Sequence, residues 1–217
     1  MQLVVAVTHG LSNASVPSEL DDFWSAAWSS VGSLNLDDAR KHPHVDDWRM
    51  RFREQGVSMK RFPTSIEALL RRALKGGELF RINPLVDFYN ALSLRHVCPA
   101  GAFDLNDLEA PIELRFSVDG DQYQALDADQ VISVVAGEIA YASASNVLTR
   151  HFMWRQSRLA LISADSSDIF MVSEIPAAAG RDVADSMRSA MEHGLANFFG
   201  RECETFIMTE GDDQIAW

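Results

Sequence analysis

The sequence predicts an α+β fold: a helical first half, then a largely antiparallel or mixed sheet, and a C-terminal helix. Apolar residues recur at helical spacing over much of residues 18–96, whereas from Ile112 they alternate with a period close to two. Because the two patterns occupy separate parts of the chain, they favour α+β over alternating βαβ units. A length of 217 residues fits one domain, which we expect to span residues 1–217.

The first half is expected to hold one strand and four helices. Leu3–Val7 is a short β-branched run that ends at a turn, which is typical of a strand. Thr64 and Glu67 have the spacing of a capping box. Asn83 and Pro84 are suited to cap and begin the next helix. The expected helices run from Ser18 to about Val31, from about Val45 to Gly56, from Ser65 to Gly76, and onward from Pro84.

The second half is expected to consist of short strands, followed by a helix and a last strand. Pro99–Asp104 is interpreted as a loop and Asp119–Asp121 as a hairpin turn. Apolar residues along Arg181–Phe199 recur at helical spacing, which predicts a helix. The expected strands are 112–118, 122–125, 131–135, 139–142, 147–151, 159–163, 169–174 and 205–209.

Charge is distributed unevenly along this acidic chain. The 19 basic and 31 acidic residues give a net charge of −12, which taken alone argues against nucleic acid as a partner. Between Arg40 and Arg81, however, the net charge is +6, and the rest of the chain carries −18. This asymmetry indicates one anion-facing surface on a body that otherwise repels anions. The alternative is a pair of solvated helices that happen to be basic.

Several classes of protein and site are disfavoured by what the sequence lacks. No apolar run approaches the ~20 residues of a membrane helix, and Met1–Val7 lacks the basic start of a signal peptide. Cys98 and Cys203 lie far apart, so a disulfide scaffold is excluded and a cytoplasmic location is expected. Cys98 is interpreted as a small buried residue. His42 and His44 resemble a metal pair without a third ligand at helical spacing, so no metal is expected.

Two segments carry polar residues that packing in a hydrophobic core does not explain. In Arg81–Arg95, the residues Asn83, Asp87 and Asn90 share one helix face. In Trp154–Ser157, tryptophan, arginine and glutamine stand side by side, which suits recognition of a planar or carboxyl-bearing ligand. The alternatives are structural: Asn83 serves only as a cap, Asp87 only in an ion pair, and the tryptophan only in the core.

These segments resemble the B3/B4 editing module of the phenylalanyl-tRNA synthetase β subunit and, more closely, the free-standing B3/4-domain proteins. The family line reads "pS.eaLlrR…NPlVDlyNalSL…pxGafDldkleg.i.lRf" and is followed by strands and a "WRQS" segment. The present chain supplies the corresponding parts at Pro63–Arg72, Asn83–Leu94, Pro99–Phe116 and Trp154–Ser157. The resemblance covers about residues 48–174. Residues 1–40 and 176–217 are expected to be extensions packed on this core.

The resemblance implies hydrolysis of a wrongly attached amino acid from the 3′ end of a tRNA, with tyrosine on phenylalanine tRNA as the family case. Such ester hydrolysis needs a positioned water, donors for the developing oxyanion and a pocket that selects the side chain, and it needs no metal or organic cofactor. A pocket that hydrogen-bonds a phenolic hydroxyl discriminates by ~10⁴ or more, which a difference of one methylene cannot achieve. The expected partners are tRNA, aminoacyl-tRNA or a tRNA synthetase, and no membrane.

The matched positions also imply roles for individual residues. Asn90 would orient the substrate or the water, Gly101 would allow close approach of the ribose or amino acid, and Arg155 with Gln156 would hold a polar group of the ester. Ser93, Phe103 and Trp154 would form pocket walls, and Arg71, Arg72 and Lys75 would contact phosphates. We expect one concave pocket to be lined by Asn90, Gly101, Phe103, Trp154, Arg155 and Gln156.

The chain departs from the synthetase pattern at two polar positions. Gly101 stands where the bacterial synthetases have a histidine, and Arg155–Gln156 lie near the place of a pocket glutamate. In a hydrolase without these groups, the substrate differs or its own ribose hydroxyl activates the water. Two other hypotheses therefore stay open: a non-catalytic module that binds tRNA or a synthetase, and a small-molecule binder or hydrolase that keeps the fold. An RNA-acting protein needs its basic residues on the side of the pocket, and a small-molecule enzyme does not.

Overall fold

The computed structural model describes residues 1–15, 17–212 and 214–216 and has the α+β fold that the sequence predicts. The helices are α1 (Ser18–Ser30), α2 (Pro43–Glu54), α3 (Ser65–Leu74), α4 (Pro84–His96) and α5 (Gly180–Phe199). The strands are β1 (Gln2–Thr8), β2 (Ala100–Asp104), β3 (Glu113–Phe116), β4 (Gln122–Gln124), β5 (Val131–Ser133), β6 (Ile139–Ser143), β7 (Asn146–Arg150), β8 (Arg155–Gln156), β9 (Ile169–Ile175) and β10 (Glu204–Met208). Short 3₁₀ helices lie at Val31–Leu34, Ala39–Lys41, Leu105–Asp107 and Ala177–Ala179.

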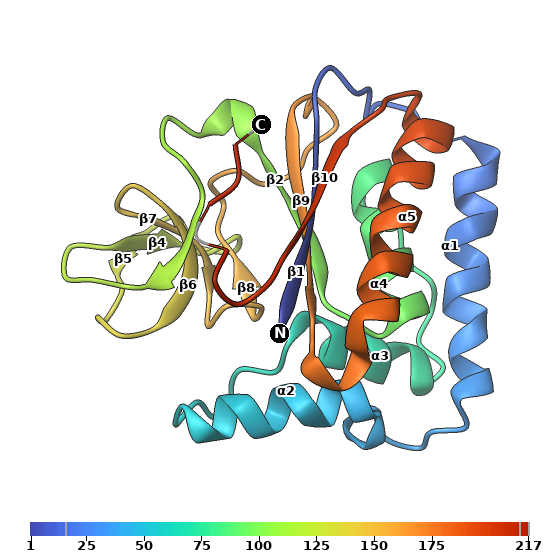
Figure 1. Ribbon diagram of the computed structural model, residues 1–217, viewed down its shortest axis with the longest axis horizontal. Coiled ribbons are helices and arrows are strands. Elements are labelled where there is room, and N and C mark those ends of the chain that lie inside the picture. The colour runs from blue at the N-terminus through green and yellow to red at the C-terminus, as the bar shows by residue number, and fades with distance from the viewer. Residues whose placement is uncertain (16, 213, 217) are drawn as a thin grey trace.

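An antiparallel sheet of four strands, ordered β10-β1-β9-β2, forms the centre of the molecule (Figure 1). Successive side chains of a strand point to opposite faces, so β1 contributes to two cores. Val4 and Ala6 pack with residues of α1, α4 and α5. Val5 and Val7 pack with residues of the second sheet. Burial on both faces explains why β1 and β9 are almost continuously apolar.

The second sheet is mixed and lies on the side of the central sheet away from the helices (Figure 1). Its order is β3-β6-β7-β4-β5, with β8 paired to β7, and β4 runs parallel to β7 whereas the other pairs are antiparallel. The Phe103 ring of β2 packs between Tyr141 of β6 and Phe170 of β9, at centroid distances of 5.6 and 6.4 Å. The contact between Phe103 and Tyr141 joins the two sheets, and the contact with Phe170 lies within the central sheet.

Capping fixes where α3 and α4 begin. Thr64 Oγ1 accepts a hydrogen bond from the Glu67 N–H (3.3 Å), and Asn83 Oδ1 accepts one from the Val86 N–H (3.0 Å). The Glu67 carboxylate does not complete the capping box, because Arg49 of α2 holds it through two hydrogen bonds of 2.9 Å. This largely buried ion pair fixes α2 against α3.

The two ends of the chain are part of the central sheet. β1 lies between β9 and β10, so the N-terminal strand occupies the middle of the sheet and the C-terminal strand occupies one edge. α5 covers the helical face through buried residues such as Met187 and Leu195. The segments beyond the matched motifs therefore supply β1, α1, α5 and β10.

Three expectations for the second half are wrong. Residues 159–163 follow an irregular path, because Ala160 is left-handed (φ 58°) and the Ile162 carbonyl accepts from the Asn83 side chain instead of a strand. Pro99–Asp104 is not a loop, since β2 pairs along β9. Asp119–Asp121 forms a turn between β3 and β4, but β3 pairs with β6, and β4 pairs with β5 and β7.

Candidate functional site

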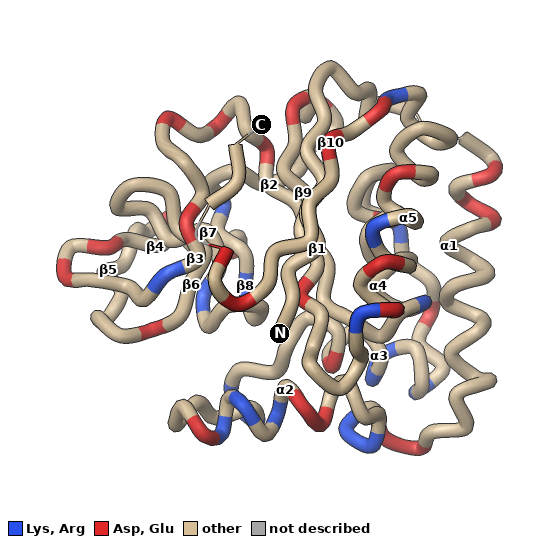
Figure 2. The backbone as a smooth tube through the Cα atoms, viewed as in Figure 1, with Lys and Arg blue, Asp and Glu red and all other residues tan. Residues whose placement is uncertain are grey.

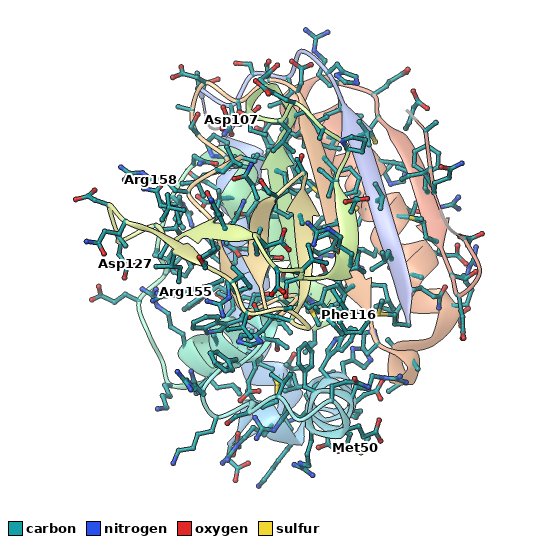
Figure 3. All side chains as sticks on the ribbon, turned by 90° about the vertical axis from the view of Figure 1, so that its left-hand side faces the viewer. Met50, Asp107, Phe116, Asp127, Arg155 and Arg158 are labelled. Carbon is teal, nitrogen blue, oxygen red and sulfur yellow. The ribbon has the colours of Figure 1, made fainter. Side chains whose placement is uncertain are left out.

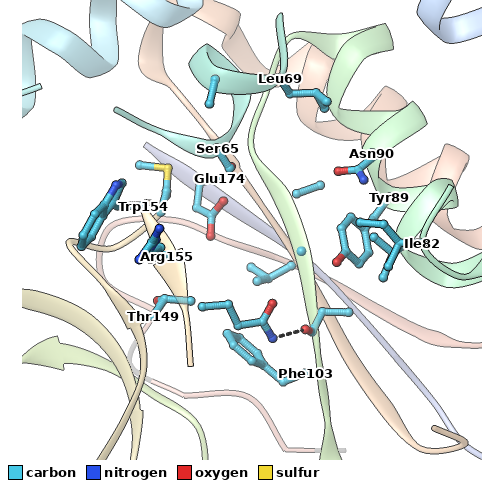
Figure 4. A pocket seen from close by; sticks show the side chains of 18 of the residues that line it. Ser65, Leu69, Ile82, Tyr89, Asn90, Phe103, Thr149, Trp154, Arg155 and Glu174 are labelled. Carbon is cyan, nitrogen blue, oxygen red and sulfur yellow. Dashed lines mark hydrogen bonds between the residues drawn. The ribbon is translucent and has the colours of Figure 1, made fainter. Parts of the chain in front are cut away.

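A pocket of about 420 Å³ lies where β2, the edge strand of the central sheet, faces the β7–β8 hairpin of the second sheet (Figure 4). Residues of α3, α4 and the segment between them form its other walls. Most lining side chains are apolar, and a few polar groups interrupt them. This combination is typical of a site for a small molecule or for one end of a larger one.

The six residues that the sequence predicts to share one pocket meet here. They come from α4, β2 and the β7–β8 hairpin, which are distant in sequence. The six are Asn90, Gly101, Phe103, Trp154, Arg155 and Gln156. The expected convergence is therefore observed, and the roles assigned to these residues stay predictions.

Ser93 is the predicted pocket residue that the structure places elsewhere. It lies about one helical turn beyond Asn90 on α4 and is 3% exposed, in the packed part of the helix outside the pocket wall. Val86, Tyr89 and Asn90 line the pocket from the preceding turn. The pocket therefore ends before Ser93, which corrects its assignment to the pocket wall.

Asn90 and Gly101 provide unused hydrogen-bonding capacity and space. Within the part of the chain that the structure describes, the Asn90 side-chain amide has no hydrogen-bond partner, and it lies at the pocket wall in Figure 4. A Cβ atom added to Gly101 would meet no atom within 4 Å. The backbone of Gly101 is also outside the left-handed region, so the glycine contributes room in the pocket and no special conformation.

Gln156 attaches the hairpin to the outer edge of β2. Its Nε2 donates to the Ala102 carbonyl at 3.0 Å (Figure 4) and lies 3.4 Å from the Ala160 carbonyl. The Asp104 N–H also points away from β9 and donates to the Ala160 carbonyl at 3.0 Å. Because backbone groups alternate along a strand, the Ala102 N–H points outward as well. The Gln156 amide thus has a structural role, and the strand edge offers a backbone donor.

Arg155 and Trp154 stand at the rim of the pocket. The Arg155 side chain is 51% exposed, and its Nη1 lies 3.5 Å from the exposed carboxylate of Asp127 (Figure 3). Its guanidinium also lies over the Trp154 ring, 5.5 Å from the centroid. An exposed ion pair of this kind contributes only ~0–1 kcal/mol, so the guanidinium can exchange Asp127 for another anion.

A buried carboxyl group that sequence reasoning missed lines the same pocket. Glu174 of β9 is 4% exposed, and the Tyr141 hydroxyl donates to its Oε1 at 2.9 Å. Burial raises the pKa of Glu174 to about 8, so the group is mostly protonated at neutral pH. Burial also keeps the pKa of Tyr141 well above its usual value. A protonated Glu174 can donate one hydrogen bond and accept others.

A comparison with family models decides the family. Residues 47–199 match the model of the B3/4 domain. The chain belongs to the B3/4 domain family. This confirms the resemblance seen in the motifs, and the matched range also includes α5, which lies beyond those motifs.

One solved structure similar to this B3/4 domain is an N-terminal fragment of the phenylalanyl-tRNA synthetase β-subunit from Pyrococcus horikoshii. The sequence identity is 9% and the TM-score is 0.40. The similarity covers 60% of this chain and 47% of the other, so the chain spans about half of that fragment. No curated protein matches the sequence. Among the described residues of this B3/4 domain, no helix is long and apolar enough to cross a membrane.

Many of the basic residues of the B3/4 domain lie on α2, α3 and the segments next to these helices (Figure 2). Arg72 lines the pocket, with its guanidinium 4.2 Å from the centroid of the Phe80 ring. Arg71 and Lys75 line a neighbouring cavity of about 460 Å³ together with Lys60. The three predicted phosphate contacts therefore lie on two faces of α3, and one of these faces borders the pocket.

His42 and His44 have structural partners in this B3/4 domain. His42 Nδ1 accepts from the His44 N–H (3.2 Å) and caps α2, which begins at Pro43, two residues before the expected start. His44 Nδ1 lies 3.1 Å from the His96 carbonyl oxygen. Among the described residues, no group of three or more His, Cys, Asp or Glu side chains is placed to hold a metal ion. Cys98 is buried as expected, and burial raises the pKa of its thiol.

Proposed function

We propose that this protein is a stand-alone factor that hydrolyses the ester between an amino acid and the 3′ end of a tRNA. The observation that carries the proposal is the single pocket lined by residues of every matched motif together with a buried carboxyl group. Membership of the B3/4 family supports it. Fold alone does not establish an activity, so the argument depends on the chemistry of the pocket.

Ester hydrolysis needs donors for the negative charge that develops on the carbonyl oxygen as water adds. Two such donors at the pocket wall are the outward N–H of Ala102 and the amide of Asn90, which has no partner among the described residues. Loss of one oxyanion donor typically costs about 10²–10³ in rate. After water adds to the ester carbon, the bond to the ribose oxygen breaks and that oxygen takes a proton. The products are the free amino acid and an uncharged tRNA.

The pocket lacks an obvious general base at neutral pH. Glu174 is the only carboxylic acid among its described lining residues, which include no histidine, and burial keeps the carboxyl protonated. We therefore assign activation of the water to the free ribose hydroxyl next to the ester. The protein would position the water and the ester and stabilise the oxyanion.

The interior of the pocket favours an amino acid whose side chain is apolar or aromatic and carries one polar atom. Leu69, Phe80, Val86 and Phe103 supply apolar walls. Glu174 supplies a protonated carboxyl among them. A site that hydrogen-bonds a hydroxyl group rejects an analogue without it far more strongly than a site that senses one methylene. Tyrosine, the family case, meets this description.

The basic residues suit the approach of tRNA from the side of α3. Arg72 at the pocket, with Arg71, Lys75 and Lys60 beside it, can contact phosphates near the 3′ end. The strong negative charge elsewhere disfavours other modes of binding. Arg155 at the opposite rim is suited to a phosphate or to a polar group of the ester.

A non-catalytic module that binds aminoacyl-tRNA is the second candidate. The observation that favours it is the protonated state of Glu174, since at neutral pH this carboxyl cannot accept a proton from water. In that case the pocket would hold the aminoacyl end without hydrolysing it, or pass it to a synthetase.

A deacylation assay with a panel of aminoacyl-tRNAs separates the two candidates. Each charged tRNA is incubated without added metal, with wild type, with Gly101→Val or with buffer. Hydrolysis of one or a few members by wild type, at least about tenfold above buffer and absent in Gly101→Val, supports the hydrolase. Protection of the ester by wild type supports the binding module. If wild type neither hydrolyses nor protects any member, both candidates are wrong.

A further inference from the structure

A second hollow, separate from the proposed site, lies between α2 and the second sheet. It has a volume of about 550 Å³. Its floor and walls are mostly apolar and include Trp48, Phe52, Val57, Phe62, Phe116, Val135, Ile139 and Phe152. We refer to it as the α2 groove. Phe152 lines both the α2 groove and the pocket, so the two hollows share one wall.

The rim of the α2 groove exposes apolar side chains that soluble proteins usually cover. Val135 is 80% exposed and Phe116 is 59% exposed. Phe116 is visible on the face shown in Figure 3, and so is the half-exposed Met50 of α2, which lies outside the lining of the groove. Contiguous apolar surface bordered by polar residues marks an interaction site more often than an isolated exposed residue does.

The charged groups of the α2 groove leave a positive rim. Arg150 is compensated by Glu138 at 2.6 Å, and both are largely buried. Arg51 is half exposed and lies 3.2 Å from Asp47. Within the described part of the chain, Arg61 pairs with no carboxylate, and its guanidinium lies over the Phe62 ring at 5.0 Å. An occupant with a carboxylate near an apolar anchor would complement this rim.

We propose that the α2 groove docks a short acidic protein segment that inserts one or more large apolar side chains. A protein segment is favoured over RNA because the groove offers one unpaired arginine, whereas RNA binding depends on several cations that neutralise phosphates. Recognition of an amphipathic segment in an apolar groove depends on anchors and complementary charge, both of which are present here. The proposal is independent of the deacylase activity.

The test is selection from a phage-displayed library of random 12-residue peptides on the full-length protein, followed by affinity measurements with the best synthetic peptides. The expected consensus has Asp or Glu next to Leu, Phe, Met or Trp. Val135→Asp places a negative charge at the mouth of the groove and should weaken binding at least about tenfold, because it repels the peptide and removes an apolar surface. Arg61→Ala should weaken binding about threefold or more and remove its salt dependence.

Val118→Asp is the matched control. Val118 is 54% exposed in the turn after β3 and lies outside the α2 groove, so this variant should bind like wild type. Circular dichroism melting curves should show that all three variants are folded. Peptides without an acidic and apolar consensus, or binding that Val135→Asp and Val118→Asp affect equally, would overturn the proposal. So would displacement of the peptide by single-stranded RNA, or self-association that Val135→Asp abolishes, which would identify RNA or a second copy as the occupant.

Discussion

The pocket and the α2 groove lie on the two sides of Phe152 and differ in their polar groups and in the partners of those groups. Both are mostly apolar, and the α2 groove is the larger, at about 550 Å³ against about 420 Å³. In the pocket, the Asn90 amide has no hydrogen-bond partner among the described residues, and a protonated Glu174 lies among apolar walls. In the groove, the buried charges of Arg150 and Glu138 satisfy one another. The two hollows therefore differ in the kind of polar group that they present. The pocket presents an amide and a protonated carboxyl, whereas the groove presents a buried ion pair and two ring nitrogens, Trp48 Nε1 and His151 Nε2, without a hydrogen-bond partner among the described residues.

Filling the pocket without touching the groove should have the largest effect. Gly101→Val projects its side chain into open space, so the fold should persist while the aminoacyl group is displaced. We expect the deacylation rate to fall at least about a hundredfold, since small displacements of a reacting group have costs of this size. Affinity for a groove peptide should be unchanged. Single-turnover deacylation and peptide binding measure the two effects.

Gly32→Val is the control for that substitution. Gly32 is exposed, and an added Cβ there also meets no atom within 4 Å. It should therefore retain wild-type deacylation. Equal activity of Gly101→Val and wild type would mean that the ester does not occupy this pocket.

Removing the guanidinium at the pocket rim should have the next largest effect. Arg155→Ala should slow deacylation about ten- to a hundredfold, the usual size for one charged hydrogen bond that acts in the transition state. Arg155→Lys should also slow deacylation, because an ammonium does not reproduce a bidentate donor. Arg158→Ala is the matched control, since Arg158 is equally exposed, pairs with Asp129 at 3.6 Å and lies outside the pocket (Figure 3). If Arg155→Ala lowers only the melting temperature, the arginine has a structural role.

The buried carboxyl of the pocket should make stability depend on pH. The pKa of Glu174 is raised in the folded state to about 8, from an ordinary value near 4.5, so the folded protein holds a proton that the unfolded chain releases. Stability from this group is complete below pH 4.5 and is lost as the pH rises to about 8. The slope is at most about 1.4 kcal/mol per pH unit.

Glu174→Gln should abolish this dependence. The variant should resemble wild type at pH 5 and become relatively more stable as the pH approaches 8.5. Urea denaturation of both proteins across this range measures the difference, which separates Glu174 from the other titrating groups. A constant difference between the two proteins would show that Glu174 is ionised or hydrated in the folded state.

The smallest expected effect concerns the basic face of α3. Replacing Arg71 or Lys75 by alanine should weaken tRNA binding a few-fold and reduce the log–log salt slope by about 0.7–0.9 for each phosphate that the variant no longer neutralises. Peptide binding in the α2 groove should not change. Arg181→Ala on α5 is the control, because this exposed arginine lies away from the pocket and pairs with Asp185. If tRNA affinity depends neither on salt nor on Arg71 and Lys75, tRNA does not bind to this face of α3.

Local sequence signals predicted the elements that local interactions define. The caps at Thr64 and Asn83 and the apolar spacing of the helices identified α3, α4 and α5. The sequence does not predict β2, because the preceding Pro99 and the alanine and glycine residues of the strand are typical of a loop, and the strand exists through long-range pairing with β9. The two-residue periodicity that begins at Ile112 predicts a strand at residues 159–163, but Ala160 is left-handed and the backbone bonds to side chains and to β2.

The candidate site was predicted from its motifs, but its most unusual group was not. Ser93 shares the helix with Asn90, and no local signal shows that the pocket ends between them. The sequence does contain a signal for Glu174, because it is the one charged residue in the strand IFMVSEI. It follows Val172 by two positions, which places both side chains on one face of the strand. The raised pKa of Glu174 could not be read from the sequence, because it depends on burial against Tyr141 of the other sheet.

The most direct test of the central claim is calorimetric binding of a non-hydrolysable aminoacyl end. A panel of 3′-aminoacylamino-3′-deoxyadenosines, in which an amide replaces the ester, is titrated into wild type, Gly101→Val and Gly32→Val. We expect saturable binding of at least one analogue, strongest for an aromatic side chain with a hydroxyl group, that Gly101→Val abolishes and Gly32→Val retains. Absence of binding across the panel, or binding that Gly101→Val leaves intact, would contradict the claim that this pocket receives the aminoacyl end of tRNA.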